Sequence, residues 1–312
     1  MILLLSSLGC DVQTRLLKNE LERRGIETLV IDTHALHKKD ISVSLSSKGE
    51  VKLSINKKNI VLEKIILTTN PRTDAILYSP SSILYPMEWR YRIGSFLREF
   101  IDLFEEQCYP GTFSAIQQGE SKMKVMRYGT STGLNIPTIS QISFNEPKGY
   151  RFIKPLGFPF IVSNTTNNTD EVCVTSFGGM AKNSDPLKHY PNMSQTPIQA
   201  QYHLRCFATT EKVFTSSRKV LKGEKLIDLR QLNESENFNP IWSETILSKK
   251  TDGYLKKLLK SMSLKWACPE FLVDKQGKEI FIDLNPCGDW YGFFQKKTRR
   301  EIVGHLGDLI LR

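Results

Sequence analysis

The amino-acid sequence predicts an α/β protein, because short apolar runs typical of strands alternate with helical patterns from the first residues onward. Ile2–Leu5 is a continuous apolar run, and Thr28–Ile31 is a second run of β type. Between them, apolar residues recur at helical spacing over 12–24, and Gly25 is a residue that commonly ends a helix. This order predicts a βαβ unit with parallel strands. The unit lacks G-x-G-x-x-G, so a dinucleotide site has no support.

Two patterns extend the prediction to about residue 115. Ile41–Leu45 and Val51–Ile55 alternate apolar and polar residues on either side of a Ser-Lys-Gly turn, which predicts a hairpin. The stretch 88–107 predicts a helix whose apolar stripe faces the core, formed by Ile93, Phe96, Leu97, Phe100 and Phe104. Pro110-Gly111 then ends the first domain.

Near the carboxyl end, residues 268–285 predict a β-hairpin that carries three oxygen-bearing side chains. β-type runs flank the polar turn Asp274–Gly277. Glu270 lies near the open end of the first strand, and Asp283 and Asn285 share one face of the second, because alternate strand residues point to the same side. Such oxygens suit Mg²⁺, which takes one or two carboxylates and completes its octahedron with water and substrate phosphates. The alternative is a surface hairpin with solvent-facing acids, and spacing alone leaves both interpretations open.

Composition limits the partners and the compartment. The chain has 312 residues, a formal net charge of +10 and a pI near 9.2, which indicates an anionic partner such as nucleic acid, an acidic peptide or nucleotide phosphate. No long basic run, zinc finger or RNP motif is present, so we expect no nucleic-acid binding. The six cysteines form no CxxC pair and are expected to be reduced thiols of a cytoplasmic protein. The opening apolar run is too short for a signal peptide or a membrane span, so we expect no membrane partner.

The carboxyl-terminal hairpin resembles the closing motif of the ATP-grasp ligases, in which an acid on one strand and an E-x-N-P on the next hold the Mg²⁺ ions that bridge ATP phosphates. Glu270 stands where this family usually has Asp, and Asp283 stands where it usually has Glu. The continuation from Asn285 to Trp290, N-P-C-G-D-W, is similar to the N-P-x-G-x-W of one subfamily, the graspetide synthetases, which are microviridin-type peptide macrocyclases. The resemblance implies ATP and Mg²⁺ as cofactors and Glu270, Asp283 and Asn285 as metal ligands.

Two lysines match further motifs of this family. Lys122 begins a predicted helix and precedes Gly133 by the spacing of the phosphate-contacting lysine in the family's N-K…G-L-x-[IV]-P-x-T. Lys154 precedes Pro155 in a predicted strand, similar to the family's ϕ-K-P-L, whose lysine reaches the ATP phosphates. The resemblance implies that both lysines bind the cofactor; without it, Lys122 is one solvated helix lysine among many. The polar segment 163–186 is either a flap over the phosphates or a surface insertion.

The segment Pro197–Arg205 resembles the family's hinge and the E-L-R or D-L-R strand that follows it, which implies a cofactor-binding role for Gln199. The glutamate that usually follows this glutamine is Ala200 here, and several residues before Arg205 are missing. The adenine pocket is therefore either built differently or degraded. After Arg205 the chain keeps the family's R-x₆-K-V-F spacing.

Asp228-Leu229-Arg230 takes the place of the family's D-W-R. The resemblance implies catalytic roles for Arg205, Arg230 and Asp228, with the arginines facing a phosphate or a substrate carboxylate. Taken singly, each arginine would more often form a surface ion pair. His203 is two residues before Arg205 and shares its face in an alternating strand, so it either lines the same site or is a satisfied structural histidine.

The resemblance implies an ATP-grasp fold with an N-terminal βαβ domain over 1–115, a central domain over 116–192 and an antiparallel-sheet-rich domain over 193–312. It implies a ligase that activates Asp or Glu side chains of a ribosomal precursor peptide, with leader and core, as acylphosphates. A Ser or Thr hydroxyl or a Lys amine of the same peptide then displaces phosphate and gives an ester or amide crosslink. The positive charge favours an acidic precursor. A second copy of the chain, in a homodimer, is a further partner hypothesis.

Two alternatives remain at this point. A ligase of the same fold could append an amino acid to a protein tail or a small molecule, like the ribosomal-protein glutamate ligases, although the N-P-C-G-D-W ending argues against it. A protein that kept the fold but lost nucleotide binding could serve as a non-catalytic peptide-binding protein, which the shortened hinge permits.

Overall fold

The protein was analysed as a computed structural model. The structure describes residues 1–6, 12–33, 36, 40–68, 86–138, 140–143, 152–155, 161–162, 172–173, 179–180, 192–220 and 241–312.

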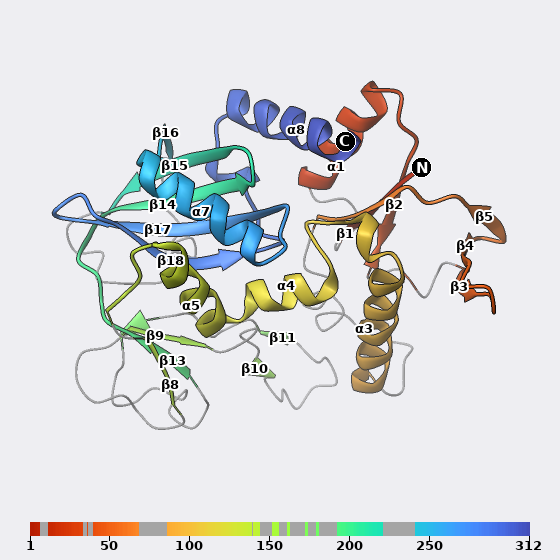
Figure 1. The fold of residues 1–312 in the computed structure, drawn as a ribbon, viewed down its shortest axis with the longest axis horizontal. Helices are drawn as coiled ribbons and strands as arrows, with labels where there is room; N and C mark the ends of the chain where they lie inside the picture. The colour runs from red at the N-terminus through yellow and green to blue at the C-terminus, as the bar shows by residue number, and fades with distance from the viewer. Residues whose placement is uncertain are drawn as a thin grey trace.

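The N-terminal sheet is parallel, as the sequence predicts (Figure 1). β1 (Ile2–Ser6) is buried along its whole length and pairs in parallel with β2 (Thr28–Asp32). The helix α1 (Val12–Arg23) connects these two strands. On its other side β1 pairs with β6 (Lys64–Leu67), which pairs in turn with β7 (Cys108–Tyr109). The predicted βαβ unit is therefore confirmed.

The predicted hairpin forms β3 (Ile41–Leu45) and β4 (Val51–Ile55), and β5 (Lys58–Ile60) adds a third antiparallel strand. The predicted long helix is α3 (Pro86–Leu103), with Leu97 and Phe100 buried. The expected end at Gln107 was wrong for the α-helix, because residues after Leu103 tighten into the 3₁₀ turn Glu105–Gln107.

The middle of the chain begins with two helices, α4 (Phe113–Glu120) and α5 (Lys122–Thr132). Gly133 ends α5 in the left-handed conformation with φ +97°, as the sequence predicts. An antiparallel sheet follows in the order β12-β9-β13-β8, and a two-stranded sheet pairs β10 with β11. Their bounds are β8 Ser140–Ser143, β9 Phe152–Pro155, β10 Ile161–Val162, β11 Val172–Cys173, β12 Gly179–Met180 and β13 Asn192–Gln195. Most of the predicted flap over 163–186 lies outside the described residues.

The largest sheet is antiparallel and five-stranded, in the order β16-β15-β14-β17-β18. Its strands are β14 Ala200–Thr209, β15 Val213–Lys219, β16 Ser243–Thr245, β17 Trp266–Asp274 and β18 Glu279–Asn285. β17 and β18 form the predicted hairpin, whose turn is closed by the Asp274 side chain accepting hydrogen bonds from the backbone N–H groups of Gln276 and Lys278, each at 2.9 Å.

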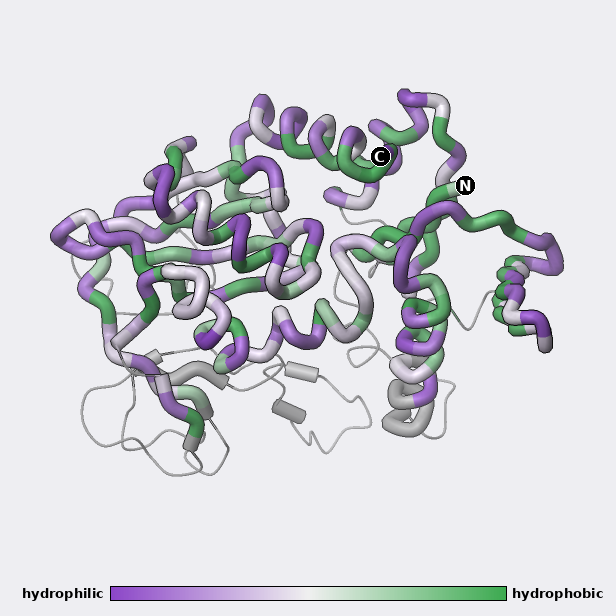
Figure 2. Tube along the Cα trace, in the orientation of Figure 1, coloured by the Kyte–Doolittle hydropathy of each residue, from purple (hydrophilic) through white to green (hydrophobic). Residues whose placement is uncertain are grey.

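The two faces of this sheet have different coverings. One face carries Phe271 and Phe281, which pack in one apolar cluster with residues of α7 (Lys249–Ser261), the helix drawn across the sheet in Figure 1. The other face carries Phe207, which packs near the buried Trp290 and the C-terminal helix α8 (Lys296–Leu311). Figure 2 shows apolar and polar residues alternating along α8, the pattern of a helix with one buried side. Neither α7 nor α8 is among the elements predicted above.

The C-terminal helix α8 lies beside the first helix, α1, so the two ends of the chain are close in space (Figure 1). Arg24 at the end of α1 forms an ion pair of 2.6 Å with Asp308 and donates to the Gly304 carbonyl at 2.9 Å. Leu306 and Ile310 of α8 share one apolar cluster with Ile2 and Leu4 of β1. Among the described residues, no helix is long and apolar enough to cross a membrane. The domain boundaries at 115 and 192 stay a prediction.

Replacing Leu306 with Ala should lower the free energy of unfolding by about 2–5 kcal/mol, because the side chain is only 3% exposed and its loss leaves a cavity between α8 and the parallel sheet. Leu311→Ala is the control on the same helix, since Leu311 is 42% exposed; it should change the free energy by less than about 0.5 kcal/mol. Urea unfolding followed by circular dichroism measures both. Equal losses in the two variants would contradict this packing.

Candidate active site

A row of polar residues crosses the five-stranded sheet on the face opposite α7. Each member is the direct cross-strand neighbour of the next, and such neighbours point to the same side of a sheet. From β16 to β18 the row is Glu244, Ser216, Arg205, Glu270 and Asp283. Because one residue comes from each strand, segments far apart in sequence meet along one line.

A β-bulge brings the two acids of the row together. Glu270 pairs with Asp283 while Phe271 pairs with Phe281, so Ile282 is an extra residue on β18. The bulge keeps both Phe side chains in the core cluster and still sets Asp283 beside Glu270 on the opposite face. The structure thus places Glu270 and Asp283 as neighbours.

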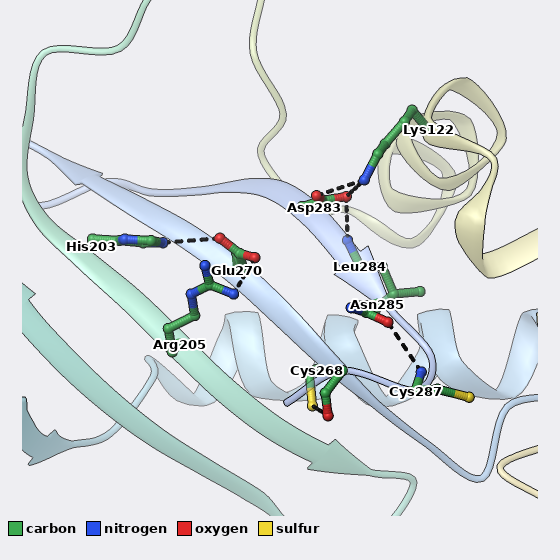
Figure 3. A network of polar contacts seen from close by, with 10 residues as sticks. Lys122, His203, Arg205, Cys268, Glu270, Asp283, Leu284, Asn285 and Cys287 are labelled. Carbon is green, nitrogen blue, oxygen red and sulfur yellow. Dashed lines mark hydrogen bonds and ion pairs between the residues drawn. The ribbon is translucent and has the colours of Figure 1, made fainter. Parts of the chain in front are cut away.

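Each of these acids has a basic partner (Figure 3). Lys122, at the start of α5, lies with its Nζ 2.6 Å and 2.7 Å from the two carboxylate oxygens of Asp283. Arg205 forms an ion pair from Nη1 to Oε1 of Glu270. The four side chains are between 16% and 23% exposed, so solvent reaches them only in part. Two cations thereby offset the repulsion between two neighbouring carboxylates.

His203, for which the sequence allows two interpretations, lies within this site. Its Nε2 lies 3.1 Å from Oε2 of Glu270, and its side chain is 6% exposed. Burial lowers the pKa of His203, and the hydrogen bond to Glu270 opposes this only in part. Because a carboxylate oxygen only accepts hydrogen bonds, Nε2 carries a proton and donates it to Glu270.

The loop after β18 holds Asn285 in place. Asn285 Oδ1 accepts a hydrogen bond of 3.2 Å from the Cys287 backbone N–H. Gly288 fits tightly against this turn, because a Cβ there would lie 2.7 Å from the Cβ of Cys268 and 3.1 Å from the Cβ of Asn285. The backbone N–H of Trp290 then donates to Oε1 of Gln13 at 2.8 Å, which joins the loop to α1.

The oxygen donors of this site fit Mg²⁺. Among the described residues, no group of three or more His, Cys, Asp or Glu side chains could hold a metal ion alone. Glu270, Asp283 and Asn285 supply two carboxylates and an amide oxygen that keeps a second lone pair. Mg²⁺ is usually bound in this way, by one or two carboxylates together with substrate phosphates. The ammonium of Lys122 already contacts both oxygens of Asp283, which shows that the carboxylate accepts a close cation.

The other predicted residues have different outcomes. Gln199 lines a cleft of about 300 Å³ together with Pro137, Lys278 and Ile280, a volume at the lower end for small-molecule sites. Lys154 lies on β9 opposite Met193, and its side chain is outside the described part. Asp228 and Arg230 both lie outside the described residues. The structure therefore gathers Lys122, Arg205, Glu270, Asp283 and Asn285, and adds His203.

Gly288→Ala should lower the free energy of unfolding by about 1–3 kcal/mol, because the new methyl group has no space beside Cys268 and Asn285. Gly253→Ala is the control: Gly253 lies in α7, and a Cβ there would meet nothing within 4 Å. That change should raise stability by about 0.5–1 kcal/mol, since Ala favours helix. Thermal unfolding of both variants measures the difference, and a neutral Gly288→Ala would show that the turn is loose.

Solved structures resemble this one over the whole chain. The macrocyclase MdnC of Microcystis aeruginosa, bound with its precursor peptide MdnA, has a TM-score of 0.79 and 16% identity, covering 100% of this chain and 99% of that one. A RiPP-associated ATP-grasp ligase of Chryseobacterium gregarium, in complex with ADP and a leader and core peptide, has a TM-score of 0.77 and 13% identity, covering 99% and 96%. The ATP-grasp ligase PsnB, complexed with a minimal precursor, Mg and ADP, has a TM-score of 0.70 and 15% identity, covering 99% and 96%.

In sequence comparisons, no protein-family model and no curated protein matches the chain. At identities of 13–16%, the structural likeness concerns the fold. The predicted architecture is confirmed, and the chain has the fold of the ATP-grasp ligases.

Proposed function

We propose that this protein is an ATP-dependent, ADP-forming ligase that crosslinks side chains within a ribosomally made precursor peptide. The observation that carries the proposal is the cross-strand row in which Glu270 and Asp283 lie side by side, flanked by Arg205 and Lys122. The row is built on a fold whose solved examples include a macrocyclase bound with a precursor peptide and ligases bound with ADP and peptides.

The nucleotide would be held by the residues that the site gathers. Glu270, Asp283 and Asn285 would hold Mg²⁺, which neutralises phosphate charge when bound. Lys122 would leave Asp283 for a phosphate, a transfer that a flexible lysine can make because its ammonium is a mobile point charge. Lys154 is proposed as a second phosphate ligand. The cleft beside Gln199 is the proposed place of the adenine base.

The proposed reaction has two steps. An oxygen of an Asp or Glu side chain of the peptide attacks the γ-phosphorus of ATP, and the bond from that phosphorus to the ADP oxygen breaks. A Ser or Thr hydroxyl or a Lys amine then attacks the acyl carbon, loses its proton, and phosphate leaves. An ester or an amide crosslink results.

The residues of the site address the main difficulty of this reaction, which is to bring an anionic carboxylate to an anionic phosphate. Unless cations are present, the Coulomb repulsion between the two anions at short range costs on the order of several kcal/mol. Arg205 pairs with Glu270 on the sheet face that carries the two acids, so we propose that it faces the reacting groups. Arg230 is proposed to act with it and Asp228 to assist proton transfer.

The partner is proposed to be a precursor peptide with leader and core. A net charge of +10 would favour an acidic precursor, because opposite charges speed the encounter. The thiols of Cys108, Cys206 and Cys268 are buried and free of disulfides among the described residues, which supports the expectation of a reducing, cytoplasmic setting. A homodimer stays a prediction that sedimentation can test.

Incubation with Mg-ATP and the precursor peptide should produce ADP and lower the mass of the peptide by one water per crosslink, measured by mass spectrometry. Asp283→Asn should slow ADP formation and crosslinking by more than about 100-fold, because a metal ligand loses its charge. Asp308→Asn is the control, since Asp308 lies 56% exposed on α8 in an ion pair with Arg24; it should leave both rates unchanged.

Other outcomes would support the alternatives. A gain in peptide mass equal to an added amino acid, with ADP formed, would indicate a ligase of the glutamate-ligase type. Binding of the peptide without ADP formation would indicate a non-catalytic peptide-binding protein. Either result contradicts the proposed crosslinking.

A further inference from the structure

Glu270 is contacted at both of its carboxylate oxygens, by Arg205 and by His203, and the proposed reaction gives a role to Arg205 but none to His203. Arg205 contacts Oε1, and His203 contacts Oε2 at 3.1 Å (Figure 3). A carboxylate bonded at one oxygen can still turn about its last side-chain bond. Bonds at both oxygens, from two different residues of the same strand, remove that freedom.

His203 and Arg205 are themselves connected by packed aromatic rings. Trp242 lies with its ring centre 5.6 Å from that of His203, at an interplanar angle of 64°. Phe293 packs edge-on against Trp242 at 5.1 Å, and the Arg205 guanidinium lies 4.7 Å from the Phe293 ring centre. His203, Trp242, Phe293 and Arg205 thus form a closed series around Glu270, which we name the Glu270 clamp.

The geometry of the clamp suits a group that orients a metal ligand. A carboxylate oxygen only accepts hydrogen bonds, so the nitrogen that faces Glu270, Nε2, carries an imidazole proton. The N–H donor therefore orients the carboxylate along the direction of the hydrogen bond. Hydrogen bonds of this kind to ligating side chains typically change metal affinity by about 10–100-fold when they are removed.

We infer that His203 is a positioning residue that fixes the orientation in which Glu270 meets the metal of the bound nucleotide, with Trp242 holding the imidazole in place. The inference rests on the proposed function, since it needs Glu270 to be a metal ligand. His203 then acts only through Glu270 and touches neither nucleotide nor peptide. The competing explanation is that His203 is purely structural and that its hydrogen bond only satisfies a partly buried carboxylate.

Two amide substitutions separate these explanations. In His203→Gln the side-chain nitrogen stands near the place of Nε2 and can still donate to Glu270, whereas in His203→Asn it stands near the place of Nδ1 and falls short. The matched control is His305→Asn, because the Nε2 of His305 bonds the hydroxyl of Thr209, at the end of β14, at 2.9 Å.

The measurement is the affinity for Mn²⁺ in the presence of ADP, read from the electron paramagnetic resonance of free Mn²⁺. His203→Asn should weaken Mn²⁺ binding by about 10-fold or more, and His203→Gln should stay within about 3-fold of the wild type. Metal-free ADP binding, measured by calorimetry in EDTA, should be alike in all four proteins. Melting temperatures show whether each variant is folded.

The outcomes decide between the explanations. If His203→Asn binds Mn²⁺ as the wild type does, the positioning role is wrong while the proposed function stands. If Gln restores the melting temperature but not the Mn²⁺ affinity, the histidine is structural and the inference fails. If the wild-type protein takes up no Mn²⁺ with ADP, the proposed function fails and the inference fails with it.

Discussion

The two carboxylates of Glu270 and Asp283 lie directly opposite each other on neighbouring strands, and the rest of the site depends on how this pair of like charges is tolerated. Like charges in such positions destabilise a sheet. Here the Arg205 guanidinium on the next strand pairs with Glu270, and the Lys122 ammonium at the start of α5 pairs with Asp283. The arrangement keeps two anionic oxygen donors together, partly shielded from water, which is what a phosphate-bound magnesium ion needs.

The fold supplies each part of this arrangement from a different place in the chain. The bulge at Ile282 lets β18 face the core with Phe281 and the site with Asp283. The start of α5 delivers Lys122, and the tight turn at Gly288 anchors the end of the strand. The backbone N–H of Trp290 then donates to Gln13, so α1 and the end of β18 hold the same loop. Stability and site geometry are coupled at that point.

Much of the local structure could be predicted from the sequence, since periodicity marks it. The apolar run of β1, the alternation of β3 and β4 and the turn after Asp274 each identify their element. α7 could also have been predicted, because Thr251, Leu255, Leu258 and Leu259 recur at helical spacing between lysines and form its buried side.

Contacts between distant residues could not be predicted in this way. The ion pair of Lys122 with Asp283 joins residues 161 positions apart, and no local pattern encodes it. His203 shows a different limit. Alternation places it on the face of Arg205, but the bond to Glu270 depends on the register of two strands. The ring contact with Trp242 comes from a residue that lies just before β16. The resemblance to ATP-grasp motifs identified Lys122, Glu270 and Asp283 because it carries the three-dimensional arrangement that spacing lacks.

Glu270 and Asp283 are proposed to hold the metal of a bound nucleotide. A crystal structure with ADP and Mn²⁺, with data collected at the manganese absorption edge, would locate that metal. We expect an anomalous peak within coordination distance of both carboxylates, with the Lys122 ammonium moved from Asp283 to a phosphate. A nucleotide bound with no metal at these acids, and Lys122 still paired with Asp283, would contradict this proposal.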